Sequence, residues 1–135
     1  MYDVVIIGAG VSGAASAREL SKYNLKVCIL EKANDVAMGA TKANSAIVHA
    51  GFDAVPGTLK AKLNVRGVEL MKTVCKELNV PLKNNEALVV AFSEEEMPHL
   101  EMLKDRGEQN GVPGLRIIRR DELVELEPNI GDAAV

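Results

Sequence analysis

The sequence has little that would serve to bind a nucleic acid. It has no tryptophan, aromatic residues make up 3% of the chain, and 16 basic residues face 19 acidic ones, for a formal net charge of -3. Proteins that bind nucleic acids usually present a basic face, and those that bind single strands also stack the bases on aromatic side chains. We therefore expect no nucleic-acid partner.

Cysteine is also scarce. Cys28 and Cys75 are the two cysteines, and they lie far apart without forming a C-x-x-C motif. This spacing argues against a redox pair and against a zinc site, because both need clustered ligands. We expect no metal centre, two ordinary buried thiols and a reducing, cytoplasmic compartment.

Long apolar segments are missing as well. The longest stretch without a charge, residues 4–17, is short and rich in glycine, whereas a membrane-spanning helix needs about 20 apolar residues. No basic segment precedes the apolar pattern that starts at Tyr2, so we expect no signal peptide. With 47% hydrophobic and 26% charged residues, the composition is typical of a soluble globular domain.

The first 31 residues predict a strand–helix–strand unit. The β-branched run Val4–Ile7 predicts a strand buried on both faces, the alanine-rich residues 11–23 a helix, and residues 26–31 a second buried strand. Two such strands joined by one helix form a right-handed parallel crossover. The predicted fold class is therefore α/β.

A G-x-G-x-x-G motif, made by Gly8, Gly10 and Gly13, lies between the first strand and the helix. In such motifs the first glycine permits a tight turn, the second lets the backbone approach a pyrophosphate, and the third lets helix and strand pack closely. Val11 and Ser12 begin the helix, whose N-terminal amides favour an anion. The motif in this context predicts a dinucleotide site.

Glu31 follows Gly13 by 18 residues, close to the spacing of about 20 at which an acidic residue binds ribose hydroxyls in such units. Its charge would repel the 2′-phosphate of NADP, so NADP is disfavoured. FAD and NAD share the fingerprint, and the βαβ unit alone does not separate them.

Residues 33–56 have no helix or strand periodicity and contain many small polar side chains. Long irregular segments of this kind are usually functional or disordered. We expect Thr41 and Lys42 to reach phosphates, and Asn44, Ser45 and the backbone near His49 to approach a flavin. Segment 39–51 thus favours FAD, with an NAD-binding module as the alternative.

The remaining residues predict three helices and two strands. Thr58 is the expected N-cap of a helix over residues 58–79, in which Gly67 suggests the close approach of another element. Residues 86–92 and 115–118 predict strands. Ser93 and Glu96 form a capping-box signature for a helix that ends at Gly111. Asp121 is expected to cap a last helix, which Pro128 ends.

These motifs together resemble the FAD-dependent oxidoreductases of the D-amino-acid-oxidase superfamily. The resemblance rests on the glycine motif, the Asn-Ser-x-x-x-His-x-Gly stretch at residues 44–51, the run at residues 56–63 and the Glu-Pro-Asn segment at residues 127–129. Within that superfamily, the chain is similar to bacterial glycerol-3-phosphate dehydrogenases and to their relatives, the L-2-hydroxyglutarate dehydrogenases.

The resemblance implies a division of the FAD site among three groups of residues. The ADP half would be surrounded by Gly8, Gly10, Gly13, Glu31 and Lys32. The pyrophosphate and ribityl part would be lined by Gly39, Ala40, Thr41, Lys42 and Asn44. The isoalloxazine ring would lie near His49, Ala50 and Gly51. Lys42 departs from the serine common at its position, and covalent attachment of flavin to His49 stays open.

The resemblance also implies the reaction, which is hydride transfer from an alcohol carbon to flavin. The favoured substrate is sn-glycerol 3-phosphate, the alternative is L-2-hydroxyglutarate, and the electron acceptor is a quinone, a protein or oxygen. The expected location is cytoplasmic or peripheral to the inner face of the membrane.

The expected organisation is a Rossmann-like FAD-binding portion over residues 1–80 and the start of a substrate domain over residues 81–135. We expect the chain to be the N-terminal part of a longer protein, with its catalytic residues beyond Val135 apart from the candidate His49. A catalytically inert fragment is therefore the further alternative.

Overall fold

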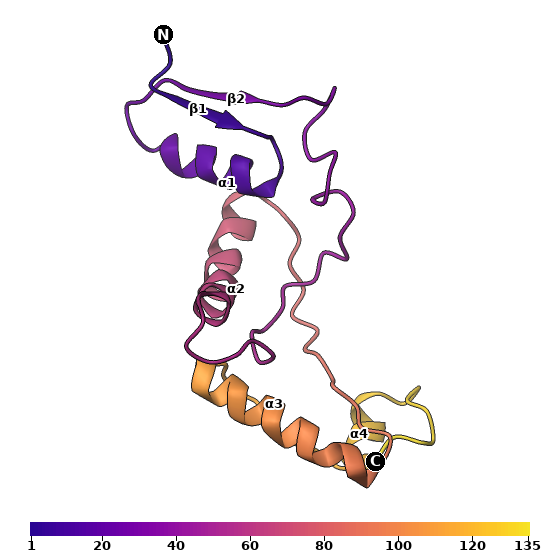
Figure 1. The fold of residues 1–135 in the computed structure, drawn as a ribbon. Helices are drawn as coiled ribbons and strands as arrows, with labels where there is room; N and C mark the ends of the chain where they lie inside the picture. Colours follow the sequence, from indigo (N-terminus) through magenta and orange to yellow (C-terminus); the bar gives the residue numbers. More distant parts are fainter. The chain divides into compact units, whose positions relative to one another are not determined.

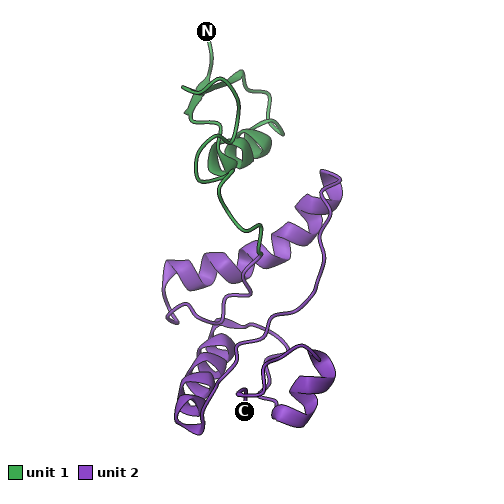
Figure 2. Cartoon of the chain, turned by 90° about the vertical axis from the view of Figure 1, so that its right-hand side faces the viewer, with its two compact units in different colours: residues 1–47 green, residues 48–135 purple.

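The computed structural model describes all 135 residues and contains a two-stranded parallel sheet and four α-helices (Figure 1). The chain forms two compact units, residues 1–47 and residues 48–135 (Figure 2). The boundary near residue 80, between an FAD-binding portion and a substrate domain, concerns function and stays a prediction.

The first unit is a βαβ unit, as the sequence predicts. Strand β1 (Val4–Ile7) is followed by helix α1 (Val11–Leu20) and strand β2 (Val27–Leu30). The strands pair in parallel, with Val4 opposite Val27 and Ile7 opposite Leu30. The carboxyl ends of both strands therefore lie at the same edge of the sheet, where the glycine motif begins.

The expected burial of both strands on both faces is wrong for these residues. Ile7 is 89% exposed and Leu30 is 55% exposed. The sheet has only two strands, and helix α1 is the one element of residues 1–47 that packs on them. Helix α1 also ends at Leu20, three residues earlier than predicted, where Ser21 donates its hydroxyl to the Arg18 carbonyl.

The second unit begins with irregular chain and then helix α2 (Leu59–Glu77). Its predicted cap is confirmed, because the Thr58 hydroxyl accepts a hydrogen bond from the Ala61 amide at 3.3 Å. Apolar side chains of this helix such as Leu59 and Leu63 are nevertheless exposed, and only Ala61 and Cys75 are buried. The spacing of apolar residues is therefore consistent with a helix here but does not show that another element packs on it.

Neither of the strands expected over residues 86–92 and 115–118 forms, and both predictions are wrong for this structure. Their residues have high strand propensity, but a strand needs a hydrogen-bonded neighbour. Along residues 86–92 the one backbone bond of this kind joins the Ala91 carbonyl to the Val135 amide at 3.1 Å. Propensity without a pairing partner leaves the segment irregular.

Helix α3 (Met97–Asn110) follows a short 3₁₀ turn, η1 (Glu94–Glu96). Gly111 ends it in the left-handed conformation, as predicted. The capping box is not formed as expected, because the Ser93 side chain caps nothing and the Glu96 carboxylate accepts from the Phe92 amide at 2.8 Å. The extra 3₁₀ turn displaces the start of α3 from Ser93.

Helix α4 (Arg120–Leu126) is the last element. The prediction that Asp121 caps it is wrong, since Arg119 occupies the cap position and Asp121 lies in the first turn. A carboxylate there still interacts favourably with the positive end of the helix dipole. The helix ends before Pro128, as expected.

Two helical glycines in this unit differ in their surroundings. A Cβ at Gly107 in α3 would overlap Leu115 and would lie 2.9 Å from the Cβ of Phe52, whereas a Cβ at Gly67 in α2 would meet nothing within 4 Å. The close approach expected at Gly67 is therefore wrong, and Gly107 is the glycine that permits one.

We expect Gly107→Ala to lower the free energy of unfolding by about 1–3 kcal/mol through overpacking. Gly67→Ala is the matched control, and it should raise that free energy by about 0.5–1 kcal/mol because alanine has less backbone entropy to lose. Urea denaturation of the two variants measures both values. Equal effects would contradict the different packing of the two glycines.

Candidate functional site

The glycine motif forms a close contact between the end of β1 and the start of α1. Gly8 has a φ of 99°, a conformation that favours glycine, and a Cβ at Gly13 would overlap the Gly8 carbonyl oxygen. The same Cβ would lie 3.3 Å from the Cγ2 of Ile6. Glycine at position 13 is therefore required for the first turn of α1 to pack against the strand, as predicted from the spacing.

Glu31 lies at the end of β2 and binds the glycine loop directly. Its Oε2 accepts a hydrogen bond from the Ala9 amide at 2.8 Å, and its Oε1 accepts one from the Ala33 amide at 2.9 Å. These two backbone bonds, with that of Ala33 the larger influence, lower the pKa of the carboxyl below its ordinary value of 4.5. The side chain is thus held as a carboxylate.

The sequence predicts that Glu31 binds ribose hydroxyls. The structure shows that Glu31 also accepts hydrogen bonds from the Ala9 and Ala33 amides. Each carboxylate oxygen can accept more than one hydrogen bond. The observed bonds therefore leave acceptor capacity for ribose hydroxyls, and they orient the carboxylate at the carboxyl edge of the sheet.

The segment after β2 folds back onto the glycine loop. The Ala37 amide donates to the Ala9 carbonyl at 3.0 Å. Further along, the hydroxyl oxygen of Thr41 accepts from the Val11 amide at 3.0 Å, and a Cβ at Gly10 would lie 3.1 Å from the same oxygen. The structure therefore places Thr41 at the N-terminus of α1, beside the motif.

Two amides at the N-terminus of α1 have no partner within the chain. Val11 donates to Thr41, whereas the amides of Ser12 and Gly13 donate to no protein atom. Unpaired amides and the helix dipole together favour an anion at this position. With Gly10 and Gly13 leaving room for close approach, the loop fits the pyrophosphate of a dinucleotide.

Asn44 stabilises the loop that carries Thr41. Its Nδ2 donates to the Thr41 carbonyl, and its Oδ1 accepts from the Ala46 amide at 2.7 Å. The other predicted residues of this loop are exposed, and the side chains of Lys32, Lys42 and Ser45 make no hydrogen bond or ion pair. Gly39 and Ala40 are exposed as well. Their contacts with a cofactor stay predictions.

The residues expected near a flavin ring belong to the second unit. Gly51 is buried, and a Cβ there would lie 3.0 Å from the Cγ2 of Val65 in α2. The His49 carbonyl accepts from Asn64, and the Gly51 carbonyl accepts from Asn110 at 3.0 Å. The side chain of His49 is exposed, and a catalytic role for it stays a prediction.

Sequence reasoning missed the two asparagines. Asn110 lies 59 residues from Gly51, and the contact follows from how α3 packs on residues 51–54. No local motif marks such a pair. The same is true of Thr41 and Val11, which lie 30 residues apart.

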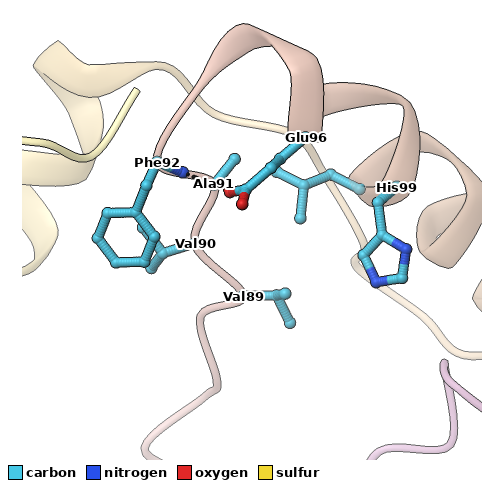
Figure 3. Close-up of a pocket in the computed structure, with 7 residues that line it drawn as sticks. Val89, Val90, Ala91, Phe92, Glu96 and His99 are labelled. Carbon is cyan, nitrogen blue, oxygen red and sulfur yellow. Dashed lines mark hydrogen bonds between the residues drawn. The ribbon is translucent and has the colours of Figure 1, made fainter.

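A hollow of about 410 Å³ in the second unit is separate from every predicted site residue. It is lined by residues 89–92 together with Glu96, His99 and Leu100. Figure 3 shows the Glu96 carboxylate turned back towards Ala91 and Phe92, and His99 on the next turn of the helix. The lining is mostly apolar and brings no nucleophile together with a base.

The chain contains no group of three or more His, Cys, Asp or Glu side chains arranged to hold a metal ion. None of its helices combines the length and the apolar character needed to cross a bilayer.

The sequence pattern of a family described as FAD dependent oxidoreductase matches residues 3–135. Glycerol 3-phosphate dehydrogenase of Caloramator mitchellensis is 55% identical over 132 residues, which cover 98% of this chain and 28% of that protein. Mitochondrial L-2-hydroxyglutarate dehydrogenase of Homo sapiens is 41% identical over 129 residues, which cover 94% of this chain and 28% of that protein. The chain thus spans less than a third of either relative.

A solved structure, dithionite-reduced L-alpha-glycerophosphate oxidase of Mycoplasma pneumoniae with FAD bound, matches with a TM-score of 0.86 and 35% identity. The match covers 99% of this chain and 36% of that one. It confirms the predicted α/β, Rossmann-like fold class, and the family match confirms the resemblance drawn from the motifs.

We expect Gly13→Ala to destabilise the protein by about 1–3 kcal/mol, because the added Cβ must displace the backbone of Gly8. Its purified form should also carry less flavin, since the anion-binding turn is displaced. Gly67→Ala is the control: a Cβ there meets nothing within 4 Å, and Gly67 lies outside the predicted flavin site. Thermal unfolding and the flavin-to-protein absorbance ratio measure both effects, and flavin content equal to that of the control would contradict the assignment.

The lowered pKa of Glu31 predicts how its contribution to stability depends on pH. A carboxylate favoured in the folded state stabilises above its unfolded pKa, and that contribution is lost as the pH falls through the lower folded pKa. We therefore expect Glu31→Gln to be less stable than the parent at neutral pH. The difference in the free energy of unfolding between the two proteins should decrease as the pH falls below 4.5, the ordinary pKa of a glutamate side chain. Urea denaturation at a series of pH values measures it, and a difference independent of pH would contradict the assignment.

Proposed function

The chain belongs to the FAD dependent oxidoreductase family, and on this premise we propose that the protein oxidises sn-glycerol 3-phosphate to dihydroxyacetone phosphate. The observation that carries the proposal is the 55% identity to a glycerol 3-phosphate dehydrogenase, compared with 41% to an L-2-hydroxyglutarate dehydrogenase. The glycerophosphate oxidase with FAD bound, at 35% identity, supports the same substrate.

The proposed FAD site uses the geometry of the glycine loop. The amides of Ser12 and Gly13 would hold the pyrophosphate, and the Thr41 hydroxyl, already fixed by the Val11 amide, would donate its proton to a phosphate oxygen. The Glu31 carboxylate would accept from ribose hydroxyls. FAD, when bound, supplies the acceptor for the hydride that leaves the alcohol carbon.

The remaining predicted residues would extend the site along the cofactor. Lys32, Lys42 and Ser45 carry donors on exposed side chains, so they can turn towards phosphate or ribityl oxygens at little cost. His49 and Gly51 would lie near the isoalloxazine ring. Because family members depend on FAD, the NAD-binding alternative is set aside.

L-2-hydroxyglutarate is the second candidate substrate. Its dehydrogenases match this chain at about the same coverage as the glycerol 3-phosphate dehydrogenase but at lower identity.

The electron acceptor belongs to the proposal as well: the names of the relatives include dehydrogenases and an oxidase, so a quinone, a protein and oxygen are all candidates. We also propose a location in the cytoplasm or at the inner face of the membrane.

Residues 1–135 by themselves are proposed to be inactive. They span about 28% of the curated relatives, and they bring together no base and substrate-binding group. Catalytic turnover would then depend on residues outside the 135 described here.

The substrate is tested by mixing the intact flavoprotein with candidate substrates without oxygen and recording flavin absorbance. We expect rapid bleaching with sn-glycerol 3-phosphate and little with L-2-hydroxyglutarate. Glycerol is the control, because it offers the same alcohol without the phosphate. Bleaching by L-2-hydroxyglutarate alone would transfer the proposal to the second candidate, and a purified protein without flavin would overturn it.

A further inference from the structure

Residues 49–54 are held in place through their backbone carbonyls. Asn64 of α2 donates its side-chain amide to the His49 carbonyl. Asn110, the last residue of α3, donates to two carbonyls, that of Gly51 at 3.0 Å and that of Ala54 at 2.8 Å. We call these bonds the carbonyl clamp. The clamp fixes the path of the chain without using any side chain of residues 49–54.

Close packing reinforces the clamp from the same two helices. Val65, next to Asn64, lies against Gly51, where an added Cβ would be 3.0 Å from its Cγ2. Gly107, one turn before Asn110, lies against Phe52. Ala54 is 2% exposed. Gly51 and Ala54 are the two buried residues of the irregular chain between β2 and α2.

Unlike the carbonyls of the clamp, the backbone amides of Ala50 and Gly51 have no hydrogen-bond partner in the chain. Gly51 is buried, yet its N–H donates to no protein atom, and the same holds for the N–H of Ala50. Buried backbone donors in native proteins almost always have a partner. With the carbonyls of His49 and Gly51 bound by the clamp, the amides of Ala50 and Gly51 are donors for an acceptor that the chain does not supply.

We propose that Asn110 is a positioning residue of the flavin site: by binding the carbonyls of Gly51 and Ala54 together, it sets the backbone that presents the amides of Ala50 and Gly51 to the flavin. This inference rests on the proposed function, which places His49–Gly51 near the isoalloxazine ring. Asn64 has the corresponding role at His49.

Asn110→Asp tests the proposal with almost no change of shape. The carboxylate cannot donate, and it faces two carbonyl oxygens that it repels. We expect the dissociation constant of FAD, measured by fluorescence quenching on the apoprotein of the intact enzyme, to rise about tenfold for the loss of two clamp bonds. The visible absorption bands of bound flavin should also shift.

Asn79→Asp is the matched control. Asn79 lies just past the C-terminal end of α2, and its side chain makes no hydrogen bond. The substitution adds the same charge near a helix C-terminus without breaking a contact, so FAD affinity should stay within about twofold of the parent. Asn110→Ser, which keeps one donor, should be intermediate and serves if the aspartate variant folds poorly.

The outcomes separate this inference from the proposed function. If the parent protein binds flavin and is reduced by substrate, but Asn110→Asp only lowers the unfolding temperature and leaves FAD affinity and the flavin spectrum equal to those of Asn79→Asp, the positioning role is wrong and the function stands. Loss of folding in both Asn110 variants would also overturn it, because Asn110 would then serve the fold alone. A parent protein without flavin contradicts the function itself.

Discussion

The site depends on the contact between Gly13 and the Gly8 carbonyl oxygen, which no side chain at position 13 would permit. Because the first turn of α1 lies directly on the end of β1, the amides of Ser12 and Gly13 are presented at the carboxyl edge of the sheet. The same approach places Ala9 within reach of Glu31 and Val11 within reach of Thr41. A single steric constraint thus accompanies two unpaired amides, an oriented carboxylate and a hydroxyl at the same place.

Much of this arrangement could be predicted from the sequence, because its signals are local. Glycine spacing, the apolar run Val4–Ile7 and the distance to Glu31 identify the βαβ unit, and Thr58 and Gly111 identify the ends of helices. The failures have a common cause. Residues 86–92 and 115–118 have strand propensity but no neighbouring strand to pair with. Ile7 and Leu30 are exposed because the sheet has only two strands and one helix packed on it. Contacts such as that of Asn110 with Gly51 depend on tertiary packing and leave no local pattern.

The two compact units are proposed to contribute to function in different ways. Residues 1–47 contain a turn whose unpaired backbone amides fit a phosphate, and this favours a dinucleotide without indicating a substrate. In residues 48–135, the side chains of Asn64 and Asn110 donate to backbone carbonyls of residues 49–54. These bonds orient peptide groups and perform no catalytic step. The choice of substrate therefore rests on the relatives, and the proposed cofactor contacts rest on the geometry.

A crystal structure of the intact protein with its flavin bound would test the proposed cofactor site. We expect pyrophosphate oxygens within hydrogen-bonding distance of the Ser12 and Gly13 amides, with the Glu31 carboxylate on the adenosine ribose and the Thr41 hydroxyl beside the phosphates. A flavin whose pyrophosphate lies away from the N-terminus of α1, with both of those amides bonded to protein or solvent instead, would contradict it.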